Sequence, residues 1–357
     1  MFTYSFYIRP VISKTKKTGS LSSMNTPNIA TVILAAGKGT RMKSEKAKVL
    51  HEVFFKPMLH HLLDTVIATD IQQTAVIVGH QREQVLASLR DEPTPYHVTP
   101  VVQQEQLGTG HAVLCAASAC ETAELVMILC GDTPLIRAET LQAMIDRHQE
   151  SKAILSLMTT VLDNPFGYGR IITDATDRII EIVEQKDATD KQQAIQEINA
   201  GIYLVDREFL FASLQQVGTE NSQGEVYLTD IISIATRQGH RVEKFVHRPA
   251  IDVLGVNSRV ELAQAHHELQ MRHNRMIMLS GVTMYGPENI LISPDCQIGQ
   301  DAVLHTGVQI TGASVVGKEV EIGSGAVLYN CQIGAGAVIR ANTVLRNCTV
   351  KEGEKIG

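Results

Sequence analysis

The chain contains no tryptophan, and only 4% of its residues are aromatic. It also has no excess of positive charge, since its formal net charge at pH 7 is -6. Proteins that bind nucleic acid need a basic face, and those that bind single strands also use aromatic side chains to stack the bases. These absences argue against a nucleic-acid partner, so any anion site should be local.

The six cysteines form no C-x-x-C pair, and the thirteen histidines form no H-E-x-x-H motif. We therefore expect reduced thiols in a cytoplasmic protein rather than a zinc site or a disulfide framework. No apolar stretch reaches the length of about 18 residues that a membrane helix needs. Residues 1–28 lack the long apolar core that export requires, and we expect them to form a disordered N-terminal tail.

Residues 29–256 alternate between short apolar runs and segments with apolar residues at helical spacing. The expected strands are 29–34, 74–79, 100–104, 124–131 and 153–160. The expected helices are 57–68, 81–90, 108–119 and 138–149. This alternation predicts an α/β fold, a Rossmann-like domain with a mostly parallel sheet and helices on both faces. Ligands of such sheets bind beyond the carboxyl ends of the strands.

Residues 257–280 are expected to form a connecting helix, because the segment 258–279 has neither glycine nor proline. Its histidines, His266, His267 and His273, are expected at solvated positions. In residues 281–357 an aliphatic residue recurs every six positions, with one five-residue step, at 292, 298, 304, 310, 316, 322, 328, 333, 339 and 345. This period predicts a left-handed parallel β-helix of hexapeptide repeats, here incomplete. Two Asn-Cys pairs lie 17 residues apart, at 330–331 and 347–348, and are expected to stack on neighbouring coils.

The stretch LAAGKGTRM, residues 34–42, directly follows the first expected strand. It fits neither the G-x-G-x-x-G dinucleotide fingerprint nor the Walker A loop. Gly37 and Gly39 allow the backbone N–H groups to approach an anion closely, while Lys38, Arg41 and Lys43 add positive charge. The loop therefore predicts a polyphosphate site, and a simple tight turn is the alternative.

Eight motifs occur together in this chain: LAAGKGTRM, KVLH (48–51), QLGTGHA (106–112), GDTPL (131–135), GYGRI (167–171), IVEQKDA (182–188), EINAGIY (197–203) and GVN (255–257). In their order, and with the helix and β-helix after them, they resemble the uridylyltransferase half of the bacterial bifunctional N-acetylglucosamine-1-phosphate uridylyltransferase / glucosamine-1-phosphate acetyltransferase family. The resemblance implies a UDP-N-acetylglucosamine diphosphorylase. Such an enzyme joins UTP to N-acetylglucosamine 1-phosphate with Mg²⁺, releasing pyrophosphate.

The resemblance also implies a role for each matched residue. Arg41 and Lys48 would be catalytic, acting on the phosphates, and Asp132 and Asn257 would hold the metal. The uridine would lie among Leu34, Ala35, Gly37, Gln103, Gly108 and Thr109, with Gln103 pairing with the base through both donor and acceptor. The amino sugar would lie among Gly169, Glu184, Asn199 and Tyr168. Further substrate-binding positions would be Ala36, Gly39, Gly131 and Asn257.

Other interpretations of three of these residues stay open from the sequence alone. Asp132 also suits a turn before Pro134, Asn257 suits the N-cap of the connecting helix, and Glu184 suits an outward-facing strand position. The histidines inside matched motifs, His51 and His111, are expected to be structural.

Two departures from the family pattern bear on function. Ala47 replaces the usual proline before the KVLH lysine, which predicts a less rigid loop. The acetyltransferase motifs are not found, and His305 is the only histidine after the connecting helix, so acetyl transfer is expected to be absent.

The β-helix predicts a homotrimer. Alternatives to the proposed reaction are a nucleotidyltransferase for another sugar phosphate or nucleotide, and a noncatalytic assembly subunit.

Overall fold

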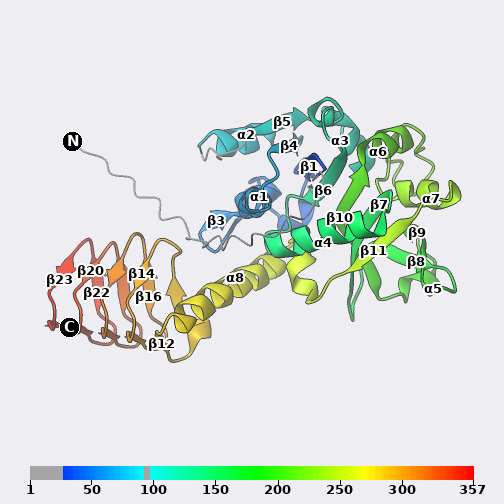
Figure 1. The fold of residues 1–357 in the computed structure, drawn as a ribbon. Helices are drawn as coiled ribbons and strands as arrows, with labels where there is room; N and C mark the ends of the chain where they lie inside the picture. The colour runs from blue at the N-terminus through cyan, green and yellow to red at the C-terminus, as the bar shows by residue number, and fades with distance from the viewer. Residues whose placement is uncertain (1–26, 92–96) are drawn as a thin grey trace, which may run out of the picture.

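The computed structural model describes residues 27–91 and 97–357 (Figure 1). The expected disordered tail lies outside the described residues, except for its last two positions. Asn28 is ordered, because its side-chain nitrogen donates a hydrogen bond to the carbonyl oxygen of Thr122 at 2.8 Å, and its own carbonyl accepts one from Glu124 N. The α/β domain therefore begins before residue 29.

One side of the large sheet consists of four parallel strands in the order β6-β1-β4-β5, with β5 at the edge. Their bounds are β1 (Ile29–Leu34), β4 (Gln73–Val78), β5 (His97–Val102) and β6 (Leu125–Cys130). Each lies within a few residues of its expected range. Because these strands are parallel, the loops after them open at one edge of the sheet.

The other strands of the sheet make it mixed rather than purely parallel. Strand β10 (Glu197–Asp206) runs antiparallel between β6 and β7 (Leu155–Val161), and β11 (Val242–Val246) pairs in parallel with β7. The hairpin of β8 (Arg170–Thr173) and β9 (Ile179–Val183) joins the sheet through β10. Strand β10 therefore carries the segment around Asn199 into the middle of the sheet.

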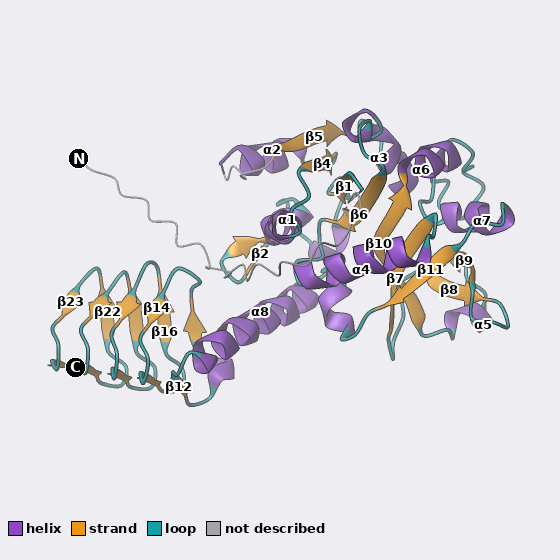
Figure 2. Ribbon diagram, in the orientation of Figure 1, coloured by secondary structure: helices purple, strands orange, loops and turns teal. Residues whose placement is uncertain are grey.

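Helices cover both faces of this sheet, as expected (Figure 2). One core joins β1 residues Ile29 and Ile33 to the helices α1 (Met58–Ala68), α2 (Arg82–Asp91) and α4 (Ala138–Ser151). The other joins Ala30 and Val32 to α3 (Thr109–Cys115), α6 (Arg207–Leu214) and α7 (Asp230–Arg237). Successive β1 residues thus enter opposite cores, as a strand buried on both faces requires.

Short elements complete the domain. They are η1 (Thr40–Met42), η2 (Lys48–Leu50), β2 (Glu52–Val53), β3 (Lys56–Pro57), η3 (Ser118–Cys120), α5 (Asp190–Gln193) and η4 (Ala250–Val253).

Helix α8 (Arg259–Leu279) connects the α/β domain to the β-helix (Figure 1). Two buried carboxamides fasten it to the first coil: Gln270 Nε2 donates to the carbonyls of Glu288 and Ile290, and Asn274 Nδ2 donates to those of Pro287 and Ile290. These four bonds satisfy carbonyl groups within η5 (Pro287–Asn289) and of the residue that follows it.

The expectation of solvated histidines on α8 is wrong for two of the three. His266 Nδ1 accepts a hydrogen bond from Phe54 N at 3.1 Å, and the His273 ring lies 5.4 Å from the Phe54 ring. Burial lowers the pKa of both imidazoles. Both pack against the β2–β3 hairpin, so they hold the helix to the α/β domain.

The C-terminal region is a left-handed parallel β-helix built from three stacks of short parallel strands. One stack is β12 (Thr283–Met284), β15 (Val303–Leu304), β18 (Glu321–Ile322), β21 (Val338–Ile339) and β24 (Lys355–Ile356). The second is β13 (Leu291–Ile292), β16 (Gln309–Thr311), β19 (Val327–Tyr329) and β22 (Val344–Arg346). The third is β14 (Gln297–Ile298), β17 (Val315–Val316), β20 (Gln332–Ile333) and β23 (Thr349–Val350).

The predicted period is confirmed in this register. Leu304, Ile322 and Ile339 are paired neighbours in one stack, and each is at most 1% exposed. The two Asn-Cys pairs stack as expected: Asn330 Nδ2 donates to Asn347 Oδ1 at 3.3 Å, and the sulfur atoms of Cys331 and Cys348 lie 3.7 Å apart. A 17- or 18-residue coil therefore brings like residues into contact.

Candidate active site at the carboxyl ends of the strands

The loop after β1 has the features of an anion cradle. Within the described residues, the backbone N–H groups of Gly37, Lys38 and Gly39 donate no hydrogen bond. Gly39 has φ 58°, and a Cβ added there would lie 2.7 Å from Lys48 Cβ. Only glycine suits this position, because the backbone has a positive φ and a side chain would collide with Lys48. The loop can therefore pack closely against the lysine.

Three polar side chains meet directly beyond the strand ends. Lys48 Nζ forms an ion pair with Asp132 and donates a hydrogen bond to Asn257 Oδ1 at 2.9 Å. The side chains of Lys48 and Asp132 are 16% and 14% exposed, so the pair is shielded but still reachable from solvent. The ammonium thus occupies a position where a carboxylate oxygen and an amide oxygen converge on one cation.

Backbone contacts fix the two oxygen donors relative to each other. Asp132 follows β6, and its carbonyl accepts a hydrogen bond from Val256 N at 2.8 Å. Gly255 passes so close that an added Cβ would lie 3.2 Å from both Asp132 carboxylate oxygens. The segment before α8 is therefore held against the turn that carries Asp132.

The N-cap interpretation of Asn257 is wrong. Helix α8 is capped by Ser258, whose hydroxyl accepts a hydrogen bond from Glu261 N at 3.3 Å. Asn257 instead donates its backbone N–H to Glu261 Oε2 at 2.7 Å. Its side chain is therefore free of a capping role, and its carbonyl oxygen faces Lys48.

A cavity of about 410 Å³ opens beside the cradle. The predicted site residues that line it are Leu34, Ala35, Ala36, Gly37, Lys48, Gln103, Gly108, Thr109 and Asp132. They come from the loops after β1, β5 and β6 and from the start of α3. Most positions assigned to the nucleotide by resemblance therefore share one cavity.

Gln103 cannot use both halves of its amide on a base, contrary to expectation. Its Nε2 donates to the Gly108 carbonyl at 3.2 Å and to His111 Nδ1 at 3.0 Å. The carbonyl contact sets the orientation of the amide, because a flipped amide would place two oxygens together. Both amide hydrogens are used within the protein, and only the carbonyl oxygen is left to accept from a ligand. His111 thus positions Gln103, and this role could not be inferred from the sequence.

A second cavity of about 210 Å³ contains Gly169, Glu184, Asn199 and Asn257, together with Tyr168. Glu184 Oε1 accepts from the Thr229 hydroxyl at 3.3 Å, so the outward-facing interpretation of this residue is wrong. Asn199 Nδ2 donates to the Tyr203 hydroxyl at 2.6 Å. Burial raises the pKa of the Glu184 carboxyl, and it raises the pKa of Tyr168 to about 12.

The two cavities meet at shared residues, namely Leu34, Thr109, Cys130 and Asp132. Asp132 therefore stands at the junction, beside Lys48. The sequence did not single out Cys130, whose thiol pKa is raised to about 12 by burial and by Asp132. A neutral thiol therefore adds an uncharged surface where the two cavities meet.

Three predicted residues do not line either cavity within the described chain: Arg41, Gly39 and Gly131. Gly131 is buried and donates its N–H to the Leu34 carbonyl at 2.9 Å, so it joins the loops after β1 and β6. Arg41 is exposed on η1, close enough to Tyr168 for its charge to lower the pKa of the phenol against the larger effect of burial.

Comparison with known proteins gives matches over most of the chain. A model of the nucleotidyl transferase family matches residues 30–267. Similar relatives include the "Bifunctional protein GlmU" of Desulfotalea psychrophila, 49% identical over 92% of this chain and 96% of the relative. Those of Geobacillus sp. and Syntrophotalea carbinolica are 44% and 40% identical, over 87% and 92% of this chain and 66% and 70% of the relatives.

The chain therefore belongs to the nucleotidyl transferase family. Its curated relatives carry the name bifunctional protein GlmU, which confirms the resemblance drawn from the motifs. The prediction of an enzyme, a UDP-N-acetylglucosamine diphosphorylase of the sugar-1-phosphate nucleotidyltransferase class, is confirmed with it. Enzymes of this type generally use a divalent metal, a sugar phosphate and a nucleoside triphosphate. Among the described residues, none of the helices combines the length and apolarity that crossing a bilayer requires.

Proposed function

We propose that the chain transfers the uridylyl group of UTP to N-acetylglucosamine 1-phosphate, giving UDP-N-acetylglucosamine and pyrophosphate. The observation that carries this proposal is the meeting of two cavities at Asp132 and Lys48. A triphosphate in the larger cavity and a sugar phosphate in the smaller one would place their reacting groups at this junction.

The proposed reaction needs charge neutralisation more than it needs a base. The attacking sugar-phosphate oxygen is already anionic near neutral pH, so no hydroxyl must lose a proton. It attacks the α-phosphorus of UTP in line with the leaving pyrophosphate. Two anions must approach each other, and the Lys48 ammonium would reduce their repulsion. The N–H groups of Gly37 and Gly39 and the Arg41 guanidinium would serve the triphosphate.

The residues present fit a magnesium ion. Magnesium prefers oxygen ligands and keeps several waters, so one carboxylate and one amide oxygen are enough protein ligands. Asp132 and Asn257 supply that pair, and in this structure the Lys48 ammonium takes the place of a cation between them. The described residues contain no cluster of three or more His, Cys, Asp or Glu side chains suited to a metal. When bound, the ion would neutralise phosphate charge.

Recognition of the two substrates would divide between the cavities. Gln103 would accept a hydrogen bond from the N3–H of uracil through its carbonyl oxygen. A cytosine has no hydrogen at that position, so this contact favours uracil over cytosine. Glu184 and Asn199 would bind hydroxyl and acetamide groups of the sugar beside Gly169.

Pyrophosphate release with a panel of substrates tests the proposal. The protein is incubated with Mg²⁺, each nucleoside triphosphate in turn, and each of several hexosamine 1-phosphates. We expect the highest kcat/KM with UTP and N-acetylglucosamine 1-phosphate. A preference for dTTP or ATP would overturn the uridine assignment, and a preference for another sugar phosphate would overturn the sugar assignment. No pyrophosphate release from any pair would refute the proposed transfer.

We further propose that this chain does not transfer acetyl groups. The proposal rests on His305, the single histidine after α8. Its Nε2 lies 3.2 Å from Glu321 Oε1, and its ring packs 5.3 Å from the Tyr285 ring. Release of free coenzyme A from acetyl-coenzyme A in the presence of glucosamine 1-phosphate would refute it.

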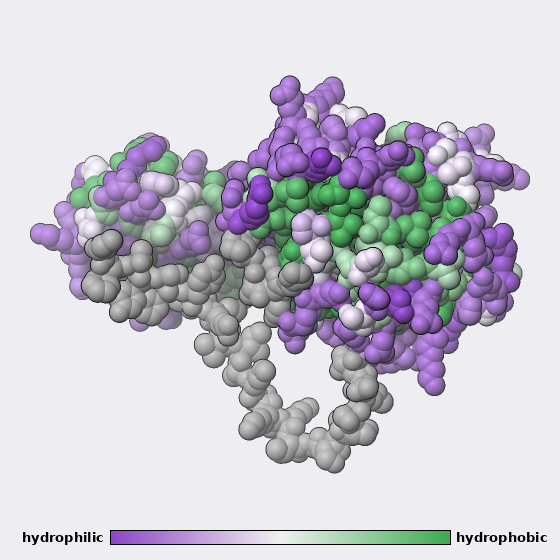
Figure 3. Space-filling view, turned by 90° about the horizontal axis from the view of Figure 1, so that it is seen from above, coloured by the Kyte–Doolittle hydropathy of each residue, from purple (hydrophilic) through white to green (hydrophobic). Residues whose placement is uncertain are grey.

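A homotrimer assembled through the β-helix is proposed as well. Apolar side chains reach the surface of the β-helix (Figure 3). One residue of this region, Val344, is 57% exposed. Burying them against neighbouring copies would remove apolar area from water. Light scattering at micromolar concentration measures the mass, and a clean monomer would refute the assembly. The cytoplasmic location stays a prediction.

A further inference from the structure

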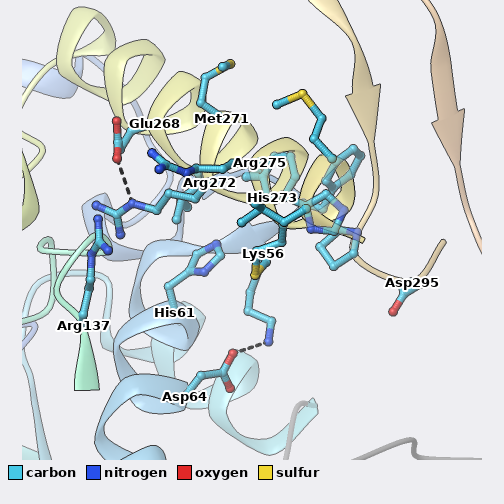
Figure 4. Close-up of a pocket in the computed structure, with 17 residues that line it drawn as sticks. Lys56, His61, Asp64, Arg137, Glu268, Met271, Arg272, His273, Arg275 and Asp295 are labelled. Carbon is cyan, nitrogen blue, oxygen red and sulfur yellow. Dashed lines mark hydrogen bonds and ion pairs between the residues drawn. The ribbon is translucent and has the colours of Figure 1, made fainter. Parts of the chain in front are cut away.

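Arg272 lies near the middle of α8 and reaches away from the β-helix toward the α/β domain (Figure 4). Its NH1 donates to the carbonyl of Leu135 at 2.8 Å, and its NH2 donates to Asp252 Oδ1 at 2.6 Å. The third nitrogen, Nε, donates to Glu268 on the same helix at 2.8 Å. One planar guanidinium therefore ties α8 to two separate segments of the domain.

Each of those segments leads to one of the two oxygen donors at the candidate metal site. Leu135 closes the GDTPL turn and lies three residues after Asp132. Asp252, on η4, lies five residues before Asn257. Arg272 thus bridges the chain segment of one donor to that of the other, away from the cavities that would hold the substrates.

The Asp252 end of the bridge is buried and charged. The Asp252 side chain is 2% exposed, and its second oxygen, Oδ2, lies 3.1 Å from Arg137 Nε and 3.4 Å from His247 Nε2. A carboxylate this deep needs cationic partners, and removing one of two arginines leaves part of its charge unpaired. The position of the Asp252 carboxylate on η4 therefore depends on Arg272. Figure 4 shows the side chains of Arg137 and Arg272 approaching each other.

We propose that Arg272 is a positioning residue, which sets the spacing of Asp132 and Asn257 at which they bind a divalent cation. The inference rests on the proposed metal role of those two residues. In this proposal the geometry of the metal site is determined by helix α8 as well as by the sheet. The guanidinium suits this role because its fork holds two acceptors in one plane, which a lysine ammonium on a flexible stem does not.

Two variants of Arg272 test the inference. Arg272→Met removes both links, and Arg272→Lys keeps a positive charge near Asp252 while losing the planar fork. The matched control is Arg275→Met, about one turn further along α8, where the side chain is exposed. Asp132→Asn reports whether the metal role itself is correct.

The main readout is binding of Mn²⁺ to the full chain, followed by the electron paramagnetic resonance signal of the free ion. It is measured with and without a nonhydrolysable UTP analogue. The second readout is the Mg²⁺ concentration that gives half-maximal pyrophosphate release at saturating substrates. Thermal melting shows whether each variant is folded.

We expect Mn²⁺ to bind about 10-fold more weakly to Arg272→Met, as is typical when an outer partner of a metal ligand is lost. The half-saturating Mg²⁺ concentration should rise in parallel, while the KM values of both substrates change little. Arg272→Lys should bind Mn²⁺ more weakly than the wild type, and Arg275→Met should match the wild type.

Wild-type Mn²⁺ affinity in a folded Arg272→Met protein would overturn the inference. Should that variant fail to fold, wild-type affinity in Arg272→Lys would overturn it equally, because the fork would then be unnecessary. Failure of the proposed metal role is distinguishable, since Asp132→Asn would then bind Mn²⁺ as well as the wild type.

Discussion

The β-helix and the α/β domain are built from contacts of very different range. In the β-helix, Asn330 bonds to Asn347, 17 residues away, and steps of 17 or 18 residues recur along the stack. In the α/β domain, Lys48 contacts Asp132 and Asn257, which lie 84 and 209 residues away. The β-helix repeats one kind of contact between neighbouring coils, whereas the α/β domain brings single residues from distant parts of the chain into one site. A change in a coil should therefore affect stability alone, and a change at the junction should affect catalysis alone.

The largest expected effect is at the junction. Asp132→Asn removes the carboxylate that pairs with Lys48, so we expect kcat/KM for pyrophosphate release to fall about 1,000-fold, or about 4 kcal/mol. The melting temperature should change little. The exposed acid Asp163 provides a matched control, because Asp163→Asn should keep full activity. Activity within a factor of two of the wild type would contradict the role of Asp132.

A core change in the β-helix should give the converse result. Ile322 is fully buried between Leu304 and Ile339, and Ile322→Ala should lower the free energy of unfolding by about 3 kcal/mol. Calorimetry measures this loss, and kcat below the transition should match the wild type. In the sheet core, Leu129→Ala should lower both stability and kcat, because Leu129 precedes the turn that carries Asp132. Loss of kcat in Ile322→Ala would show that the two regions are coupled.

The loop before Lys48 offers a smaller effect. The expectation of a less rigid loop without proline is not what the contacts indicate, because Ala47 N donates to Gln84 Oε1 at 2.9 Å, and Gln84 Nε2 donates to the Glu45 carbonyl at 3.1 Å. Gln84→Ala should reduce kcat/KM about fivefold, the value of one hydrogen bond of about 1 kcal/mol.

Adding Ala47→Pro to that variant tests the explanation. The φ of Ala47 is -53°, which proline accepts, so the ring should restore part of the lost rigidity and activity. The measurement is kcat/KM of the double variant against Gln84→Ala alone. No recovery would mean that Gln84 acts otherwise than by holding this loop.

The smallest effect concerns pH. Burial raises the pKa of Glu184 above its ordinary value of 4.5, so the folded state loses stability as the pH rises from 4.5 to the raised pKa, and the loss is complete above it. Glu184→Gln should therefore melt at a higher temperature than the wild type at neutral pH, and the difference should shrink as the pH falls toward 4.5. A Glu184→Gln protein less stable than the wild type at neutral pH would contradict it.

Much of the fold could be predicted because periodicity is a local property. The six-residue repeat placed Leu304, Ile322 and Ile339 on one stack, and alternation of apolar runs with helical segments placed the parallel strands β1, β4, β5 and β6. The antiparallel insertion of β10 was not predicted, since a strand buried on both faces has the same pattern in either direction.

The candidate site was less accessible from sequence. Motif order indicated which residues belong to it, but hydrogen-bond orientation did not follow from residue type. The amide of Gln103 is set by His111, the cap of α8 is Ser258 rather than Asn257, and the link through Arg272 joins residues that share no motif.

The sequence by itself determined the β-helix, the connecting helix, the parallel core and the family, because each is written in local spacing or in short motifs. Only the tertiary structure decided which side chains share the site and which of their atoms remain for a ligand. The physical reason is that a hydrogen bond depends on the position and direction of both partners. For partners more than 80 residues apart, such as Lys48 and Asp132, those are fixed only when the whole domain has packed.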